Sequence, residues 1–106
     1  MLPGRMLLVV TTLLLGAIAV PAHAATIQIV MENLAMSPPE ATANVGDTIE
    51  WINKDIVAHT ATARNGDWDV MLPPNTTGTL VLKKAGTVDY YCRFHPNMKA
   101  VLKIEP

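Results

Sequence analysis

From residue 25 onward the sequence consists of short runs in which apolar and polar residues alternate, and each run is followed by a turn-forming segment. In the run 26–32, for example, Ile27, Ile29 and Met31 fall on one side. A period of two residues is that of a strand with one buried face, and it is incompatible with the 3.6-residue period of a helix. The pattern therefore restricts this part of the chain to β-structure.

Further runs fit the same template, and the segments between them are rich in Gly, Pro, Asn and Asp. The predicted strands occupy 26–32, 45–53, 57–63, 79–83, 87–92 and 99–104, and the predicted separators occupy 37–40, 53–55, 64–67, 72–78 and 83–86. Short strands punctuated in this way indicate an all-β sandwich or barrel. We find no internal repeat and no stretch that could form a second domain, and any helix should be one or two turns at most.

The first 24 residues do not follow this pattern and resemble a secretory signal peptide. Arg5 precedes an apolar run from Met6 to Val20, and small residues flank His23 at the end of the segment. The apolar run is shorter than the roughly 18 to 20 residues of a membrane span, and its end has the A-x-A form of a cleavage site. We expect cleavage after Ala24, which leaves residues 25–106 as an exported domain. The single arginine argues against the twin-arginine route.

The exported part is small, so its core is at the limit of what burial alone can stabilise. Its single cysteine, Cys92, cannot form an internal disulfide, whereas a bound metal could stabilise the fold. The chain has eight Lys and Arg residues against nine Asp and Glu residues, and loss of Arg5 leaves a net charge of about −2. There is no basic run, so the composition gives no indication of nucleic-acid binding.

One motif places three metal-binding side chain types at intervals of three residues. In the segment 90–99, Cys92, His95 and Met98 follow a predicted strand, and His59 lies on another predicted strand upstream. A thiolate, two imidazoles and a weak thioether are the donors of a mononuclear blue-copper site. A strand that ends at the cysteine can direct its sulfur inward while a tight loop returns the other two side chains toward it.

Each of these residues also has an ordinary interpretation. Cys92 could be a small buried apolar residue, either histidine could be a partly exposed or core imidazole, and Met98 could simply pack in the core. Zinc would accept the cysteine and histidines but would gain little from the thioether. The combination of all four in an exported β-chain favours copper over these interpretations.

With these residues in view, the chain resembles the cupredoxins and, among them, the amicyanin-like group. Only Pro96 and Asn97 separate the second histidine from the methionine, which is the short loop of that group. The similarity extends over nearly the whole predicted domain and includes the segments 45–55, 58–63 and 84–92. The ligand motif is specific to the family, whereas the strand similarities only support it.

The resemblance implies a Greek-key β-sandwich of the cupredoxin type with one type 1 copper ion that cycles between Cu(I) and Cu(II). It implies His59, Cys92 and His95 as equatorial ligands and Met98 as the axial ligand. It further implies a monomeric, periplasmic electron carrier without a membrane anchor, whose redox partners include an amine dehydrogenase or a c-type cytochrome. We find no paired carboxylates or nucleophile motif that would indicate an enzyme, and four protein ligands leave no open position for a substrate.

The family also directs attention to the surroundings of the site. Most members carry Asn directly after the first ligand histidine, where it braces the ligand loop, but this chain has Thr60. Its hydroxyl should make one such hydrogen bond and should not reproduce the two-ended hydrogen bonding of an amide. We expect backbone N–H groups to donate to the cysteine sulfur. An apolar patch around the second histidine should include Phe94 and Pro96, and the predicted loop residues 71–74 could extend it.

Two alternatives remain open at this point. The first is copper delivery or sequestration, which exposed methionine clusters would favour, and the segment 31–36 could bring Met31 and Met36 together. The second is an interaction module that keeps the fold without a metal. Four intact candidate ligands argue against the second.

Overall fold

The computed structural model describes residues 23–106, so the predicted signal peptide lies almost wholly outside the described residues. Within that range the chain forms nine strands and no helices. Consequently, no helix of the described part could cross a membrane. The all-β prediction is confirmed.

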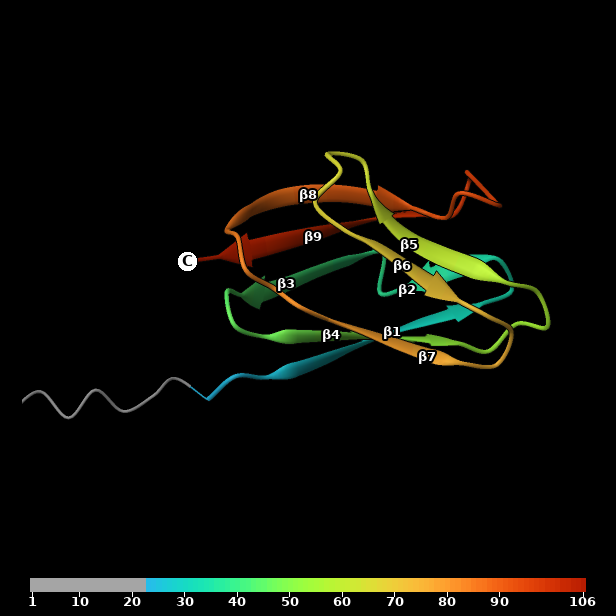
Figure 1. The fold of residues 1–106 in the computed structure, drawn as a ribbon, viewed down its shortest axis with the longest axis horizontal. Helices are drawn as coiled ribbons and strands as arrows, with labels where there is room; N and C mark the ends of the chain where they lie inside the picture. The colour runs from blue at the N-terminus through green and yellow to red at the C-terminus, as the bar shows by residue number, and fades with distance from the viewer. Residues whose placement is uncertain (1–22) are drawn as a thin grey trace, which may run out of the picture.

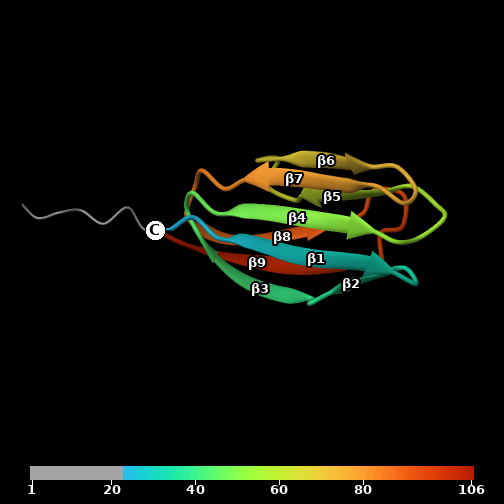
Figure 2. The ribbon, with the colours of Figure 1, turned by 90° about the horizontal axis from the view of Figure 1, so that it is seen from below.

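The nine strands form two sheets that pack face to face, as Figures 1 and 2 show. The four-stranded sheet has the order β2-β1-β4-β7, and the five-stranded sheet has the order β3-β9-β8-β5-β6. The strands are β1 (Thr26–Glu32), β2 (Ala35–Ser37), β3 (Glu40–Asn44), β4 (Thr48–Asn53), β5 (His59–Ala63), β6 (Asp69–Leu72), β7 (Thr77–Val81), β8 (Gly86–Tyr91) and β9 (Lys99–Glu105).

Two of the strand pairs are parallel and join distant parts of the sequence. Strand β1 pairs with β4, with Thr26 opposite Thr48, and β3 pairs with β9. The remaining pairs are antiparallel, including β5 with β6 and β8 with β9. The parallel pairs connect the beginning of the domain to its middle and end, so the two sheets form a single folding unit.

The core lies between the sheets and contains the apolar face of nearly every strand. Trp51 and Tyr90 are fully buried. The centre of each of their rings lies 5.3 Å from the centre of the Trp68 ring. The indole N–H of Trp51 donates to the Tyr90 hydroxyl at 3.3 Å. Tyr90 lies on β8, so this cluster packs the strand that leads to the ligand loop against the core.

The structure confirms six predicted strands and adds three. Strand β1 has the predicted bounds, and the runs at 45–53, 57–63, 79–83, 87–92 and 99–104 all contain strands. Strands β2, β3 and β6 were not predicted. In particular, the segment 72–78 is not a pure separator, because β6 ends and β7 begins within it.

The chain segments that carry the candidate ligands meet at one end of the sandwich. In Figure 1 the loop after β8 and the segment before β5 lie at the end of the molecule opposite the C-terminus. The turn between β1 and β2 lies at this same end. This is where a site built from several loops can form on a rigid frame.

Candidate metal centre

The candidate ligands come from the beginning of one strand and the loop after another. His59 is the first residue of β5, and Cys92 follows directly after the last residue of β8. The two strands are hydrogen-bonded neighbours, with Thr62 opposite Tyr91. The pairing therefore brings together side chains that are 33 residues apart in the sequence.

Three donor atoms converge in this region. The Cys92 sulfur lies 3.7 Å from Nδ1 of His59 and 3.6 Å from Nδ1 of His95, and the two Nδ1 atoms are 3.1 Å apart. In the described part of the chain, these three side chains have donor atoms close enough together, within 4.8 Å of one another, to hold a metal ion. The structure thus brings together three of the four predicted ligands.

The size of this triangle fits a metal ion. The point in its plane that is equidistant from the three atoms lies about 2.0 Å from each of them. For comparison, zinc–imidazole bonds are about 2.0 to 2.1 Å long, and zinc–thiolate bonds are about 2.3 Å long. An ion at this position would need only a slight retreat of the sulfur.

The hydrogen bonding of His59 leaves its Nδ1 free to act as a ligand. On the other side of the ring, Nε2 lies 2.7 Å from a carboxylate oxygen of Asp55. An ionised carboxylate can only accept a hydrogen bond, so Nε2 carries a proton, and Nδ1 is the nitrogen whose lone pair can bind a metal. A carboxylate behind a ligand histidine is the usual way in which proteins fix ring orientation and tautomer at metal sites.

Asp55 is itself held by the turn between β1 and β2. It accepts the backbone N–H of Asn33 at 2.8 Å and that of Leu34 at 3.1 Å, and both of these residues have positive φ, at 53° and 59°. The hydrogen bond from His59 is the main reason why the pKa of Asp55 is below its usual value, and the backbone donors add to this effect while burial opposes it. The Asp55 carboxylate is thus ionised and aligned with the His59 ring before a metal ion binds.

Asn53 organises the loop between β4 and β5. Its side-chain nitrogen lies within 3.2 Å of three carbonyl oxygens, those of Val57, Leu72 and Pro73. Its side-chain oxygen accepts the backbone N–H of Asp55 at 2.9 Å. Because this side chain is almost completely buried, it fixes the segment that leads to the first histidine.

The cysteine sulfur accepts a hydrogen bond from the protein backbone, as predicted. The backbone N–H of Thr60 lies 3.3 Å from the Cys92 sulfur, and both residues are fully buried. The Thr60 hydroxyl accepts the backbone N–H of Arg93 at 2.9 Å and lies 2.8 Å from the Thr62 hydroxyl. The Thr60 hydroxyl therefore makes the one expected hydrogen bond to the ligand loop, and the expectation that it would make no second bond is wrong, because Thr62 lies beside it on β5.

Met98 closes the ligand loop. Its backbone carbonyl accepts the N–H of Cys92 at 2.9 Å, and its own N–H donates to the carbonyl of His95 at 2.8 Å. Its side chain is only 2% exposed. The fourth predicted ligand is therefore buried within the compact loop that carries Cys92 and His95.

His95 is the ligand candidate that approaches the surface. It is half-buried, whereas His59 is fully buried, and the exposed Phe94 and Pro96 flank it. The prediction that residues 71–74 form a loop of this patch is partly wrong. Met71 and Leu72 belong to β6, where Met71 is exposed and Leu72 is fully buried in the core, because successive residues of a strand point to opposite faces.

The two N-terminal methionines do not form an exposed cluster. Met31 and Met36 are direct partners across β1 and β2, but their exposed fractions are 0% and 6%. They pack in the core. The exposed methionine cluster that would have favoured copper delivery is thus not formed by Met31 and Met36.

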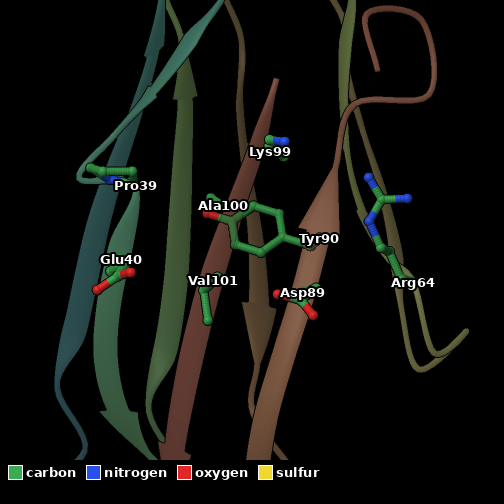
Figure 3. Close-up of a pocket in the computed structure, with 8 residues that line it drawn as sticks. All are labelled: Pro39, Glu40, Arg64, Asp89, Tyr90, Lys99, Ala100 and Val101. Atoms are coloured by element: carbon green, nitrogen blue, oxygen red, sulfur yellow. The ribbon is translucent and has the colours of Figure 1, made fainter. Parts of the chain in front are cut away.

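A separate open pocket lies on the outside of the five-stranded sheet. Figure 3 shows its lining, which contains acidic and basic side chains and none of the candidate ligands. The lining residues are Pro39, Glu40, Arg64, Asp89, Tyr90, Lys99, Ala100 and Val101. This mixed lining has no soft donor, so the pocket does not compete with the cluster as a copper site.

Four residues that shape the site were not predicted from the sequence. They are polar residues in turns or on strand surfaces, namely Asn53, Asp55, Thr62 and Asp69. A carboxylate four residues before a candidate ligand histidine is a usable signal for Asp55. The other three depend on contacts between distant segments and leave no local pattern.

Comparison with known proteins agrees with this geometry. The family described as cupredoxin-like domain matches residues 5–104. The methylamine utilization protein MauL of Methylorubrum extorquens is 32% identical over 96 residues, which cover 87% of this chain and 84% of that protein. The amicyanin of Paracoccus versutus is 28% identical over 96 residues, covering 85% of this chain and 71% of that protein.

Solved structures show the same similarity. The crystal structure of Paracoccus versutus amicyanin aligns with a TM-score of 0.66 at 27% identity, covering 82% of this chain and 86% of that chain. A purple cupredoxin from Nitrosopumilus maritimus aligns with a TM-score of 0.66 at 26% identity, covering 74% of this chain and 99% of that chain. The two-sheet arrangement is therefore shared with an amicyanin and a purple cupredoxin over most of the described chain.

Proposed function

The chain belongs to the cupredoxin-like family, and from this premise we propose that it carries single electrons between redox proteins on one type 1 copper ion. The proposed ligands are His59, Cys92, His95 and Met98. The observation that carries the proposal is the triangle formed by the cysteine sulfur and the two imidazole Nδ1 atoms. Similarity to amicyanins and to a purple cupredoxin supports it.

The donor set suits copper in both of its oxidation states. The ion supplies one-electron chemistry, because Cu(I) favours soft thiolate and thioether donors and Cu(II) favours nitrogen donors. A frame that holds all the donors in a compromise arrangement keeps atomic movement small during electron transfer. Here the frame consists of the β5–β8 pairing and the two backbone hydrogen bonds of Met98.

Two hydrogen bonds tune the electronic properties of the donors. The Asp55 carboxylate holds the proton on Nε2 of His59, which makes Nδ1 a better donor. The N–H of Thr60 draws electron density from the Cys92 sulfur and so favours the reduced state. Burial of both ligands excludes water from this side of the site.

Electrons should enter and leave through the edge of His95. This ring is half-buried, and the exposed Phe94 beside it provides an apolar surface on which a partner can dock. Ile56 and Val57, in the loop that leads to His59, are also exposed apolar residues. The Arg93 guanidinium lies 5.5 Å from the centre of the Phe94 ring, so this surface combines an apolar ring with one positive charge. A small contact area of this kind suits a transient complex that must dissociate after each transfer.

The partner proposal remains at the level of protein class. Redox proteins such as an amine dehydrogenase or a c-type cytochrome fit the similarity to amicyanins and to a methylamine utilization protein. We further propose that the protein is a monomer. We also propose that it is not an enzyme, because four protein ligands leave no position on the metal for a substrate.

Export is part of the same proposal. Residues 1–24 would act as a cleaved signal peptide, and residues 25–106 would function in the periplasm. In that compartment a single buried cysteine would be protected from oxidation by its metal and its burial.

Copper titration of residues 25–106 tests the proposal. One equivalent of Cu(II) should produce an intense blue or purple charge-transfer band and a small copper hyperfine splitting in electron paramagnetic resonance. Cys92→Ser should remove the band, because the band requires a copper–thiolate bond. Met98→Leu should alter the spectrum, and Met71→Leu, which changes an exposed methionine, is the matched control.

Weak binding at several sites without this band would contradict the proposal. Copper delivery would then be the better interpretation. That alternative is not favoured now, because Met31 and Met36 are buried.

A further inference from the structure

Arg93, which lies between two proposed ligands, is attached to the neighbouring strands in two ways. Its backbone N–H donates to the Thr60 hydroxyl at 2.9 Å. Its guanidinium binds the carboxylate of Asp69 through two contacts of 3.2 Å, one from Nε and one from a terminal nitrogen. The ligand loop is thus held at one residue from both its main chain and its side chain.

Two threonine hydroxyls connect these two attachments. The hydroxyls of Thr60 and Thr62 are 2.8 Å apart, and the Thr62 hydroxyl lies 2.6 Å from the Asp69 carboxylate. Both threonines lie on β5 and point to the same face, since they are two residues apart. Together with Arg93 they form a closed ring of hydrogen bonds.

Counting hydrogens gives the direction of this ring. A carboxylate only accepts, so the single hydrogen of Thr62 is donated to Asp69. The Thr62 oxygen must therefore accept in its contact with Thr60, and the hydrogen of Thr60 is donated to it. The Thr60 oxygen is then left to accept the N–H of Arg93, as the structure shows.

Every bond in this series points toward the same negative charge. Hydrogen bonds aligned in this way polarise one another, so the charge of Asp69 makes the Thr60 oxygen a stronger acceptor. Asp69 is half-exposed, but Thr60 is fully buried. The series thus conveys the effect of a surface carboxylate to a buried residue whose own N–H donates to the Cys92 sulfur.

We propose that Asp69 and Thr62 are positioning residues of the metal centre, and this inference rests on the proposed copper function. Both act through Thr60, and Asp69 also acts through its direct ion pair with the Arg93 guanidinium, to hold Arg93 and the loop that carries Cys92 and His95. A lone threonine could hold the loop only through a freely rotating hydroxyl. With Thr62 accepting its hydrogen, Thr60 presents a fixed acceptor and a fixed donor, as an amide side chain would.

Amide hydrogen exchange in the metal-free chain 25–106 tests the series without copper. Thr62→Val removes the connecting hydroxyl while keeping the shape and charge of the strand, so exchange of the Arg93 N–H should become roughly five to ten times faster. Thr42→Val, at an exposed threonine of β3, is the matched control and should leave that rate unchanged.

The charge at the end of the series is tested separately. Asp69→Asn should accelerate exchange of the same N–H by a few-fold. Asp67→Asn is its matched control, because Asp67 is a nearby carboxylate with its own surface ion pair to Lys84 at 3.6 Å. Equal effects of the two changes would show that overall charge, not the series, is responsible, and would overturn the proposal.

Copper-loaded protein provides two measurements, of the copper hyperfine splitting and of copper release, that report on the metal centre itself. Thr62→Val and Asp69→Asn should change the copper hyperfine splitting and release copper to a chelator several times faster, with both control variants unchanged. In a Thr60→Ser background, which keeps the hydroxyl, both effects should persist. In a Thr60→Val background, Thr62→Val should have no further effect, because the series is already broken.

The two proposals fail in different ways. Unchanged exchange of the Arg93 N–H in Thr62→Val would overturn the positioning role even if the copper spectrum is that of a type 1 site. Absence of the charge-transfer band in the unmodified chain would overturn the copper function. The exchange data come from metal-free protein, so they would still decide whether Asp69 and Thr62 hold the loop.

Discussion

The two ends of β4 are held by the same device, but only one end belongs to the metal centre. Asp47 directly precedes the strand, and its carboxylate accepts the N–H of Ala25 at 2.9 Å. Asp55 follows the strand, and its carboxylate accepts the N–H of Asn33 at 2.8 Å. Both bonds span 22 residues, which is also the offset between paired residues of the parallel strands β1 and β4.

The two carboxylates differ in one further partner. Asp47 accepts the backbone N–H of Asn44, whereas Asp55 accepts the ring N–H of His59. A side chain that fixes strand register has thus gained a second role at one end, where it also orients a ligand. Changes at the Asp47 end should therefore affect stability alone, and changes at the Asp55 end should affect stability and copper together.

The largest expected effect is on copper affinity. Asp55→Ala should weaken copper binding by about 10- to 100-fold, since it removes the group that fixes the His59 ring. Competition with a chelator of known affinity measures this loss. Asp47→Ala is the matched control and should leave the affinity within about twofold; a comparable loss in both variants would refute the division between the two ends.

The next effect is on stability. Asp47→Asn should lower the unfolding midpoint of the metal-free chain by several degrees, because the backbone N–H groups of Ala25 and Asn44 lose a charged acceptor. Thermal unfolding followed by circular dichroism measures this change. The visible spectrum of the copper form should stay as it is in the unmodified chain, and an altered spectrum would show that this end also shapes the site.

The pH dependence of stability should reflect both carboxylates. Hydrogen bonds from the backbone of Asn44 and then of Ala25 lower the pKa of Asp47, against a raising effect of burial, and the pKa of Asp55 is also lowered. A lowered pKa in the folded state means that the unfolded chain binds protons first as the pH falls. The stabilisation is thus complete above the ordinary value of 3.8 and is lost as the pH falls through the lower folded-state value.

Acid titration of the metal-free chain checks this sign. Stability should decline below about pH 4 in the unmodified protein, and Asp47→Asn should show a shallower decline because one of the carboxylates with a lowered pKa no longer titrates. A decline that begins near neutral pH and is the same in both proteins would mean that other groups dominate.

The smallest effects come from the backbone turns beside the two carboxylates. Gly46 adopts φ of 95° before Asp47, but Leu34 adopts φ of 59° where Asp55 accepts its N–H. Leu34→Gly should stabilise the chain by about 0.5–1 kcal/mol, because glycine tolerates this conformation and the relief of strain exceeds the added entropy of the unfolded chain. Gly46→Ala should destabilise it by about 1 kcal/mol, and urea unfolding of both variants would detect a reversed order.

The strands that sequence patterning predicted are those with a clear apolar face. Strand β1 alternates through Ile27, Ile29 and Met31, so its bounds were predicted correctly. Strand β3 reads EATAN, and its inward residues are alanines, which give a weak apolar signal. Strands β2 and β6 have only three and four residues, too few for a period to stand out.

The metal centre divides in the same way. Cys92, His95 and Met98 were predicted because their spacing lies within one loop, and His59 because it is the one other histidine of residues 25–106. The supporting residues could not be predicted in this way. Asp55 and Asp69 act through contacts created by the register of paired strands, and register is set by the whole fold.

One of the two backbone nitrogens that donate to Asp47 belongs to Ala25, the residue directly after the proposed cleavage point. Cleavage there would turn a peptide N–H into an α-ammonium group at hydrogen-bond distance from the carboxylate. Among residues 23–106 no Lys, Arg or His side chain forms an ion pair with Asp47, so the newly created terminus would supply its counter-charge. Maturation would then complete the fold electrostatically, and a precursor that keeps its leader would lack the cation that ties β1 to the rest of the protein.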